Sequence, residues 1–175
     1  NNPGYGGYGA FLDVPLARTL AMLQLNVLAL TELTHVFGAA IAARGGGKIL
    51  LVASIGGYQA TPNYAAYSAS KWGLRGLTKA AAMEYAGWNI RVNAVHPSIV
   101  PTPMVEGADK FVEAMEHVTA LERSASLDDV ANAVMFLAND AAGYLTGIDL
   151  PVDGGFTELG VYRQVWRRAT GRDRP

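Results

Sequence analysis

The stretch from Ser54 to Lys71 constrains the fold of this chain more than any other part of the sequence. It follows an apolar run at residues 48–53, whose length and composition predict a buried strand. It leads into residues 65–86, which are rich in Ala, Leu and Met and predict a long helix. A buried strand followed by a long helix is typical of the α/β fold class.

Three side chains of this stretch form a candidate catalytic group. Ser54 lies where the strand ends, and open α/β sheets carry their chemistry at the carboxyl ends of strands. Tyr67 and Lys71 lie one helical turn apart on the same face. A neighbouring ammonium is expected to lower the pKa of the phenol, which can then exchange a proton with an alcohol or carbonyl oxygen. The Ser54 hydroxyl can donate a hydrogen bond to the same oxygen. No hydride donor is among the three, so a redox reaction needs a bound cofactor.

The Tyr-x-x-x-Lys pair alone is a weak signal, because an exposed helix face has the same pattern. Its place at a helix start, with a strand-end Ser upstream, argues against an accidental occurrence of the pair. Seven sequence blocks then resemble the short-chain dehydrogenase/reductase family in order and spacing. They are Asn1-Asn2-Pro3-Gly4, Asn26 in its Leu-Gln-Leu-Asn-Val setting, Val52-Ala53-Ser54, the Tyr67/Lys71 pair, Ile90 to Pro97, Thr102-Pro103-Met104, and Thr146-Gly147 with Val152 to Gly155.

The resemblance implies a Rossmann-like, doubly wound parallel sheet that is incomplete at its N-terminal side. It implies an oxidoreductase that uses NAD or NADP and acts on a small-molecule secondary alcohol or ketone. The catalytic residues would be Asn26, Ser54, Tyr67 and Lys71, with Tyr67 as general acid and base. Lys71 would also hold the nicotinamide ribose, and the main-chain carbonyl of Asn26 would order a water in the proton relay. Asn26 can also be read as a satisfied buried amide.

The cofactor-binding residues implied by the family are Asn1, Gly4, Tyr67, Lys71, Pro97, Val100 and Thr102. The sequence departs from the family at Pro3, which replaces an Ala, and at Ser98, which replaces a Gly. Ser98 fits only if its backbone does not need a positive φ. Thr102 is open to a second interpretation, as the cap of the next helix. The Gly-x-Gly-x-x-Gly of residues 4–9 neither follows a strand nor opens a helix, so it is not read as a phosphate-binding turn.

Composition excludes several classes of protein. A net charge of −1 gives no reason to expect nucleic-acid or membrane binding. Three scattered histidines and no cysteine argue against a zinc site and fit a reducing, cytoplasmic compartment. Charges at Arg18, Glu32 and Arg44 are expected to keep the longest apolar stretch too short to span a membrane.

The remaining elements are predicted from periodicity and caps. A helix is expected over residues 14–44, capped by Asp13 and bent near Asn26 or Gly38. Residues 45–47 should end it. Residues 90–95 and 148–152 should be strands, and Ser126 with Asp129 should form a near capping box.

Two units follow from this reading, a truncated catalytic domain at residues 1–156 and a basic tail at 157–175, solvated or facing a partner. The resemblance implies a homodimer or homotetramer through helices 14–44 and 65–87. The family's Gly-rich turn is missing, so the 175 residues alone are expected to bind dinucleotide poorly. The alternative is a non-catalytic dinucleotide-binding or scaffold protein on the same fold.

Overall fold

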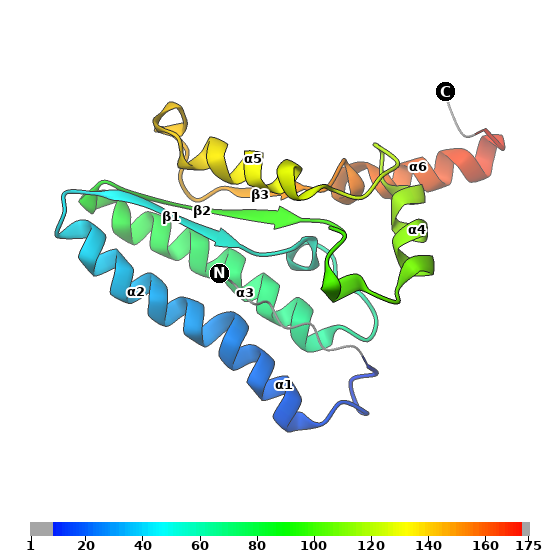
Figure 1. Cartoon of the computed structure of the whole chain (residues 1–175), viewed down its shortest axis with the longest axis horizontal. Helices are drawn as coiled ribbons and strands as arrows, with labels where there is room; N and C mark the ends of the chain where they lie inside the picture. The colour runs from blue at the N-terminus through cyan, green and yellow to red at the C-terminus, as the bar shows by residue number, and fades with distance from the viewer. Residues whose placement is uncertain (1–8, 173–175) are drawn as a thin grey trace.

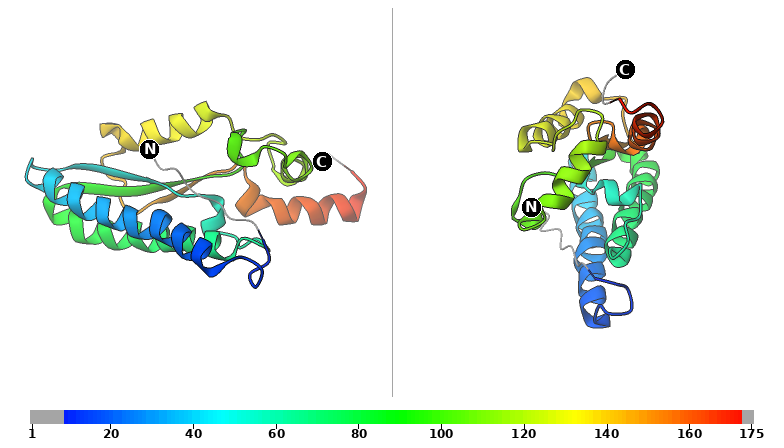
Figure 2. Two further views of the ribbon diagram at one scale, coloured as in Figure 1. Left: turned by 60° about the horizontal axis from the view of Figure 1, so that its bottom comes forward. Right: turned by 90° about the vertical axis from the view of Figure 1, so that its right-hand side faces the viewer.

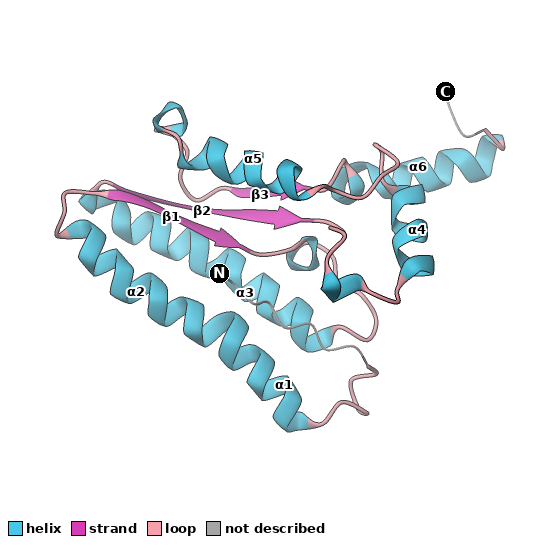
Figure 3. Cartoon of the chain, in the orientation of Figure 1, coloured by secondary structure: helices cyan, strands magenta, loops and turns pink. Residues whose placement is uncertain are grey.

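A computed structural model of the chain describes residues 9–172. Its centre is a sheet of three parallel strands in the order β1-β2-β3. These strands are β1 (Gly47–Val52), β2 (Ile90–Pro97) and β3 (Asp149–Val152). The register pairs Gly47 with Ile90 and Ala94 with Asp149, so β2 lies between the other two. All three strands end at the same edge of the sheet (Figure 3).

Helices cover both faces of this sheet (Figure 1). One face carries α3 (Ala65–Tyr85) and a continuous helix made of α1 (Leu16–Leu23), the π-helical turn η1 (Gln24–Leu28) and α2 (Ala29–Ala42). The other face carries α5 (Leu127–Ala138). Beyond the carboxyl ends of the strands lie α4 (Asp109–Val118) and α6 (Phe156–Thr170) (Figure 2). Short 3-10 turns complete the chain: η2 (Ile55–Gly57), η3 (Ala86–Trp88), η4 (Pro103–Val105) and η5 (Asp140–Ala142).

The core forms where α3 packs on β2. Every residue of β2 from Val92 to His96 is buried, as expected for a central parallel strand covered on both faces. Ala81 and Ala82 of α3 contact Ile90 and Val92, and Ile41 and Ile49 close the cluster. Small alanines on the helix let it approach the sheet closely, which fixes where α3 places its polar side chains.

The strands and the long helix α3 confirm the sequence prediction. At Asn26, one of the two places where the sequence predicts a bend, the first helix passes through the π-helical turn η1. The capping box is also confirmed, since Ser126 and Asp129 each accept a hydrogen bond from the other's main-chain N–H. The predicted cap at Asp13 is wrong: the helix begins at Leu16 after Pro15, which has no side-chain acceptor, and the Asp13 N–H instead closes a turn on the Ala10 carbonyl.

The expectation about membrane spans also needs correction. By length and composition alone, the 27-residue helix from Leu16 to Ala42 would reach across a membrane. The two charged residues Arg18 and Glu32 do not lower the mean hydropathy of this helix enough to exclude it as a membrane span. One helix of this kind is weak evidence, because core helices of soluble proteins meet the same criterion.

The segment after Gly155, for which the sequence suggested only a basic tail, starts as a helix. Two arginines of α6, Arg163 and Arg167, both pair with Glu122 in the loop that follows α4. They also donate to the main-chain carbonyls of Ala120 and His117. These bonds join α6 to the end of α4.

Candidate active site

Ser54 lies two residues beyond β1, at the carboxyl edge of the sheet. Its backbone is extended, with a φ of −174°, and it caps the turn η2. The side-chain Oγ accepts a hydrogen bond of 3.1 Å from the N–H of Gly56. The main chain at Ser54 lies between the strand before it and the turn after it, and this fixes the position of the hydroxyl.

Tyr67 lies in the first turn of α3, with its phenol beside the Ser54 side chain. Burial raises the pKa of the Tyr67 phenol, the polar interaction with Ser54 lowers it and a smaller effect of Tyr64 raises it; the net direction is upward. Gly56 leaves room for the ring: a Cβ there would lie 3.0 Å from Cε1 of Tyr67. The close approach of η2 to α3 thus favours a glycine at this position.

Lys71 follows one turn later and is only 3% exposed. Its Nζ lies 5.4 Å from the centroid of the Tyr67 ring and makes no ion pair within residues 9–172. Burial lowers the pKa of Lys71 to about 8, because the desolvated ammonium is disfavoured. The expected lowering of the Tyr67 pKa by Lys71 is absent from the structure, since burial outweighs any such effect and the ammonium is itself destabilised.

Asn26 reaches the same helix from η1. It is fully buried, and its Nδ2 donates to Oγ of Ser70 at 3.3 Å. Ser70 in turn donates to the main-chain carbonyl of Tyr67 at 2.7 Å. The wide π-helical turn, a feature often found at functional sites, thus connects Asn26 to the backbone that carries Tyr67 and Lys71.

The loop after β2 holds the other expected cofactor residues. Pro97 ends the strand, and the N–H of Ser98 donates to the Val152 carbonyl. Ser98 is not among the residues with a positive φ, so the condition for its replacing a glycine is met. Thr102 precedes η4 but its side chain makes no capping bond, which does not support the capping interpretation. Val100 lies between them, half-buried. Asn1 and Gly4 lie outside the described residues.

The geometry therefore brings Asn26, Ser54, Tyr67 and Lys71 together at one corner of the sheet. The chain that carries this group is similar to known proteins in both sequence and structure. A family model described as enoyl-(acyl carrier protein) reductase matches residues 1–157. The chain is 40% identical over 137 residues to a cyclohexanol dehydrogenase of Acinetobacter sp. (strain SE19), covering 78% of this chain and 53% of that protein.

The chain belongs to the short-chain dehydrogenase/reductase family. Two solved structures share its fold. A gluconate 5-dehydrogenase of Burkholderia cenocepacia J2315, in complex with NADP and tartrate, has a TM-score of 0.86 at 26% identity, covering 89% of this chain and 62% of that one. An NAD⁺-bound xylitol dehydrogenase has a TM-score of 0.81 at 27% identity, covering 88% and 66%. This short-chain dehydrogenase/reductase chain thus spans about half the length of the curated relative and under two thirds of the first of these structures.

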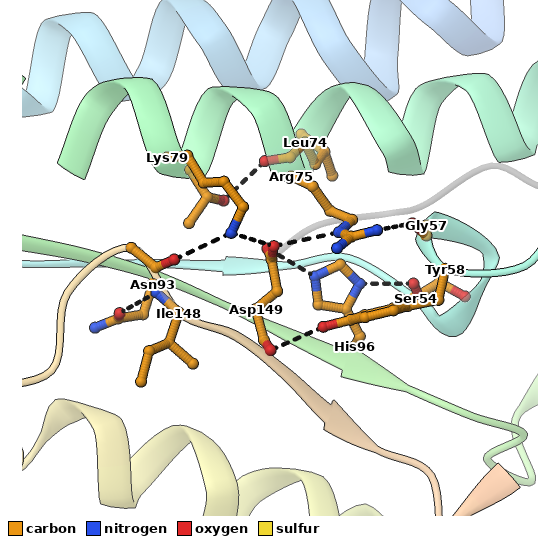
Figure 4. A network of polar contacts seen from close by, with 12 residues as sticks. Ser54, Gly57, Tyr58, Leu74, Arg75, Lys79, Asn93, His96, Ile148 and Asp149 are labelled. Atoms are coloured by element: carbon orange, nitrogen blue, oxygen red, sulfur yellow. Dashed lines mark hydrogen bonds and ion pairs between the residues drawn. The ribbon is translucent and has the colours of Figure 1, made fainter. Parts of the chain in front are cut away.

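Sequence reasoning missed a polar cluster directly behind Ser54 (Figure 4). It consists of His96 on β2, Asp149 on β3, and Arg75 with Lys79 on α3. The available signal was His96 itself, a polar residue inside a run that must be buried. Tyr58 packs against this cluster, with its ring 4.9 Å from that of His96.

Proposed function

We propose that the whole protein is an NAD(P)-dependent oxidoreductase that interconverts a secondary alcohol and its ketone. The observation that supports this most is the position of the Tyr67 phenol beside the Ser54 side chain, with the buried Lys71 ammonium one helical turn away. Two hydroxyls side by side at the carboxyl edge of a parallel sheet are arranged to bind one further oxygen between them.

The residues fit a nicotinamide dinucleotide. Lys71 is a buried cation without a carboxylate partner in the described part of the chain, and hydroxyl oxygens of a ribose are suitable acceptors for it. Pro97, Val100 and Thr102 offer main-chain groups and a hydroxyl on the neighbouring loop. Together with Asn1 and Gly4 they make up the proposed cofactor contacts. The bound nicotinamide would supply or accept the hydride.

Each side chain of the site then has a role in the reaction. Ser54 donates a hydrogen bond to the substrate oxygen and keeps it beside Tyr67. Tyr67 donates a proton to that oxygen when a ketone is reduced and accepts one when an alcohol is oxidised. Lys71, whose Nζ lies 5.4 Å from the centroid of the Tyr67 ring, is placed to hold the nicotinamide ribose. Asn26 and Ser70 fix the backbone of the helix that carries both residues.

The relatives support an alcohol substrate. The names of the cyclohexanol, gluconate and xylitol dehydrogenases all refer to substrates with hydroxyl groups. We infer that a secondary CH–OH group is the shared target, and a panel of ring and open-chain secondary alcohols with NAD⁺ or NADP⁺ tests it. Turnover of an enoyl thioester without turnover of any alcohol or ketone would contradict the proposal.

Substitution of Tyr67 provides the direct test of the mechanism. Tyr67→Phe in the whole protein should lower kcat by roughly a hundredfold to ten-thousandfold, the usual contribution of a general acid or base. Cofactor binding, followed by nucleotide fluorescence, should change little. Tyr85→Phe is the matched control, because it removes a hydroxyl from the same helix that bonds only to the Thr34 carbonyl. Equal kcat values for Tyr67→Phe and the unchanged protein would refute the role of Tyr67.

A further inference from the structure

His96 connects the Ser54 backbone to the interior of the fold (Figure 4). Its side chain is fully buried, and Nδ1 lies 2.7 Å from the main-chain oxygen of Ser54. A carbonyl oxygen can only accept, so Nδ1 carries the proton and donates it. This bond fixes the tautomer of the ring and leaves Nε2 facing the other way.

Nε2 faces Asp149, the first residue of β3, at 3.3 Å from Oδ1. The Asp149 side chain is 4% exposed, and its Oδ2 accepts from Nε of Arg75 at 3.2 Å and pairs with Nζ of Lys79 at 2.7 Å. Burial raises the pKa of Asp149, but the bonds from Lys79 and Arg75 outweigh it and the pKa is lowered. Asp149 is therefore an ionised acceptor for Arg75 and Lys79, and Nε2 of His96 lies against its other oxygen. A neutral His96 with its proton on Nδ1 cannot donate from Nε2, so it donates to Asp149 only when the ring is protonated, which burial disfavours by lowering the pKa of His96.

Arg75 makes a second connection to the Ser54 turn. Its Nη1 donates to the main-chain oxygen of Gly57 at 2.9 Å. The turn η2 is thus bonded at both ends, at Ser54 by His96 and at Gly57 by Arg75, and both donors contact one carboxylate. Gly57 packs tightly against α3, since a Cβ there would lie 2.8 Å from the Lys71 carbonyl oxygen.

We propose that His96 and Arg75, which both contact Asp149, are positioning residues for the Ser54 hydroxyl. The inference rests on the proposed function, in which Ser54 binds the substrate oxygen. A serine side chain has one rotatable bond before its oxygen, so holding the main-chain carbonyl holds Oγ within reach of Tyr67. Nothing else in the proposed mechanism uses this cluster, although it contains four ionisable side chains.

Two substitutions of His96 separate its contacts. In His96→Asn the amide nitrogen takes the place of Nδ1 and keeps the bond to Ser54, whereas in His96→Gln it takes the place of Nε2 beside Asp149 and loses the bond to Ser54. We expect His96→Gln to lower kcat by about tenfold to a hundredfold, as small misplacements of catalytic groups do, with KM within about threefold. His96→Asn should keep kcat within about threefold. Equal losses in both variants, or no loss in His96→Gln, would overturn the proposal.

Combining each change with Ser54→Ala shows whether His96 acts through Ser54. In the Ser54→Ala background, His96→Gln should cause no further loss of kcat, because residues that act as a unit are not additive. Independent, additive losses would overturn the positioning role while leaving the proposed function intact. Full activity of Ser54→Ala would instead refute the proposed function itself.

A second pair of variants avoids the buried histidine, whose replacement can impair folding. Arg75 and Lys79 contact the same Asp149 oxygen, but only Arg75 also bonds to the η2 turn. Arg75→Met should lower kcat by about tenfold, and Lys79→Met should keep it within about threefold. Thermal unfolding of both variants shows that each is folded. Equal kcat values in the two variants would contradict the proposal, as would an unchanged kcat in His96→Gln.

Discussion

At the scale of single residues, the buried ammonium of Lys71 sets the electrostatics of the site. It has no carboxylate partner in residues 9–172, so no ion pair in the described chain offsets the free-energy cost of removing this ammonium from water. A buried charge of this kind opposes folding, and residues kept at such a cost are frequent at functional sites. The buried charge of Lys71 is thus maintained against the stability of the fold.

Lys71→Met should therefore stabilise the protein while removing activity. A pKa lowered from 10.5 to about 8 corresponds to roughly 3 kcal/mol as an upper estimate. We expect a gain of up to about 3 kcal/mol in the free energy of unfolding at pH 7, measured in urea without cofactor. A less stable Lys71→Met protein at pH 7 would contradict this account of Lys71.

The sign of the pH dependence follows from the same shift. Between about pH 8 and 10.5 the unfolded chain binds a proton at Lys71 that the folded chain has lost. Folding stability should rise with pH in that window, because the unfolded state binds more protons. The penalty is complete below pH 8, so the advantage of Lys71→Met should shrink as the pH rises. Lys110→Met, a change on the exposed side of α4, is the control and should leave the profile unaltered.

At the scale of elements, α6 is attached to α4 by few polar bonds. Glu122 has a positive φ of 55° and receives both Arg163 and Arg167. Arg167 also donates to the His117 carbonyl in the last turn of α4, where a cation complements the helix dipole. Much of the remaining surface of α6 is exposed, including Tyr162 at 78%. The polar bonds between α6 and the end of α4 thus converge on one carboxylate and two main-chain carbonyls.

Glu122→Gln should loosen α6 without unfolding the sheet. Because Glu122 is 42% exposed, the loss of stability should be only about 1 kcal/mol and should shrink at high salt. Trypsin should cleave after Arg163 or Arg167 several times faster than in the unchanged protein, which mass spectrometry of the released peptides measures. Asp140→Asn breaks an exposed pair with Lys48 and is the control. An unchanged cleavage rate at low salt would show that other contacts hold α6.

At the scale of the whole molecule, large apolar side chains remain exposed on the helices of one face. They belong to α1, η1, α2 and α3 and include Leu16, Leu20, Leu28, Phe37, Trp72 and Met83. An exposed apolar surface of this extent is typical of protein–protein contact sites. We propose that helices 14–44 and 65–87 pair copies of the chain into a homodimer or homotetramer.

Met83→Glu should then lower the mass of the whole protein in solution, because a charge would be desolvated at the contact. Met83 is 83% exposed on α3, so the fold itself should tolerate the change. Met135→Glu, at 67% exposure on α5 across the sheet, is the matched control. Light scattering measures both masses. A Met83→Glu protein with unaltered mass would argue that this face does not pair copies.

Contacts within one segment of the chain can be predicted from the sequence, whereas contacts between distant segments cannot. Tyr67 and Lys71 are four residues apart on one helix and Ser54 ends the preceding strand, so local periodicity alone brings them together. His96 and Asp149 meet only because β3 pairs with β2 in a particular register, which sequence periodicity does not specify. The helix α6 was missed because its arginines find their partner far away in sequence, at Glu122.

The π-helical turn η1 has a consequence for the helix on either side of it. Met22 before the turn is 1% exposed, and Thr34 and Gly38 after it are buried as well. Each residue rotates an α-helix by about 100°, so a regular helix with one residue fewer would swing Met22 out of the interior. The single widened turn keeps the two halves of a 27-residue helix in phase, with both buried edges directed at the same core.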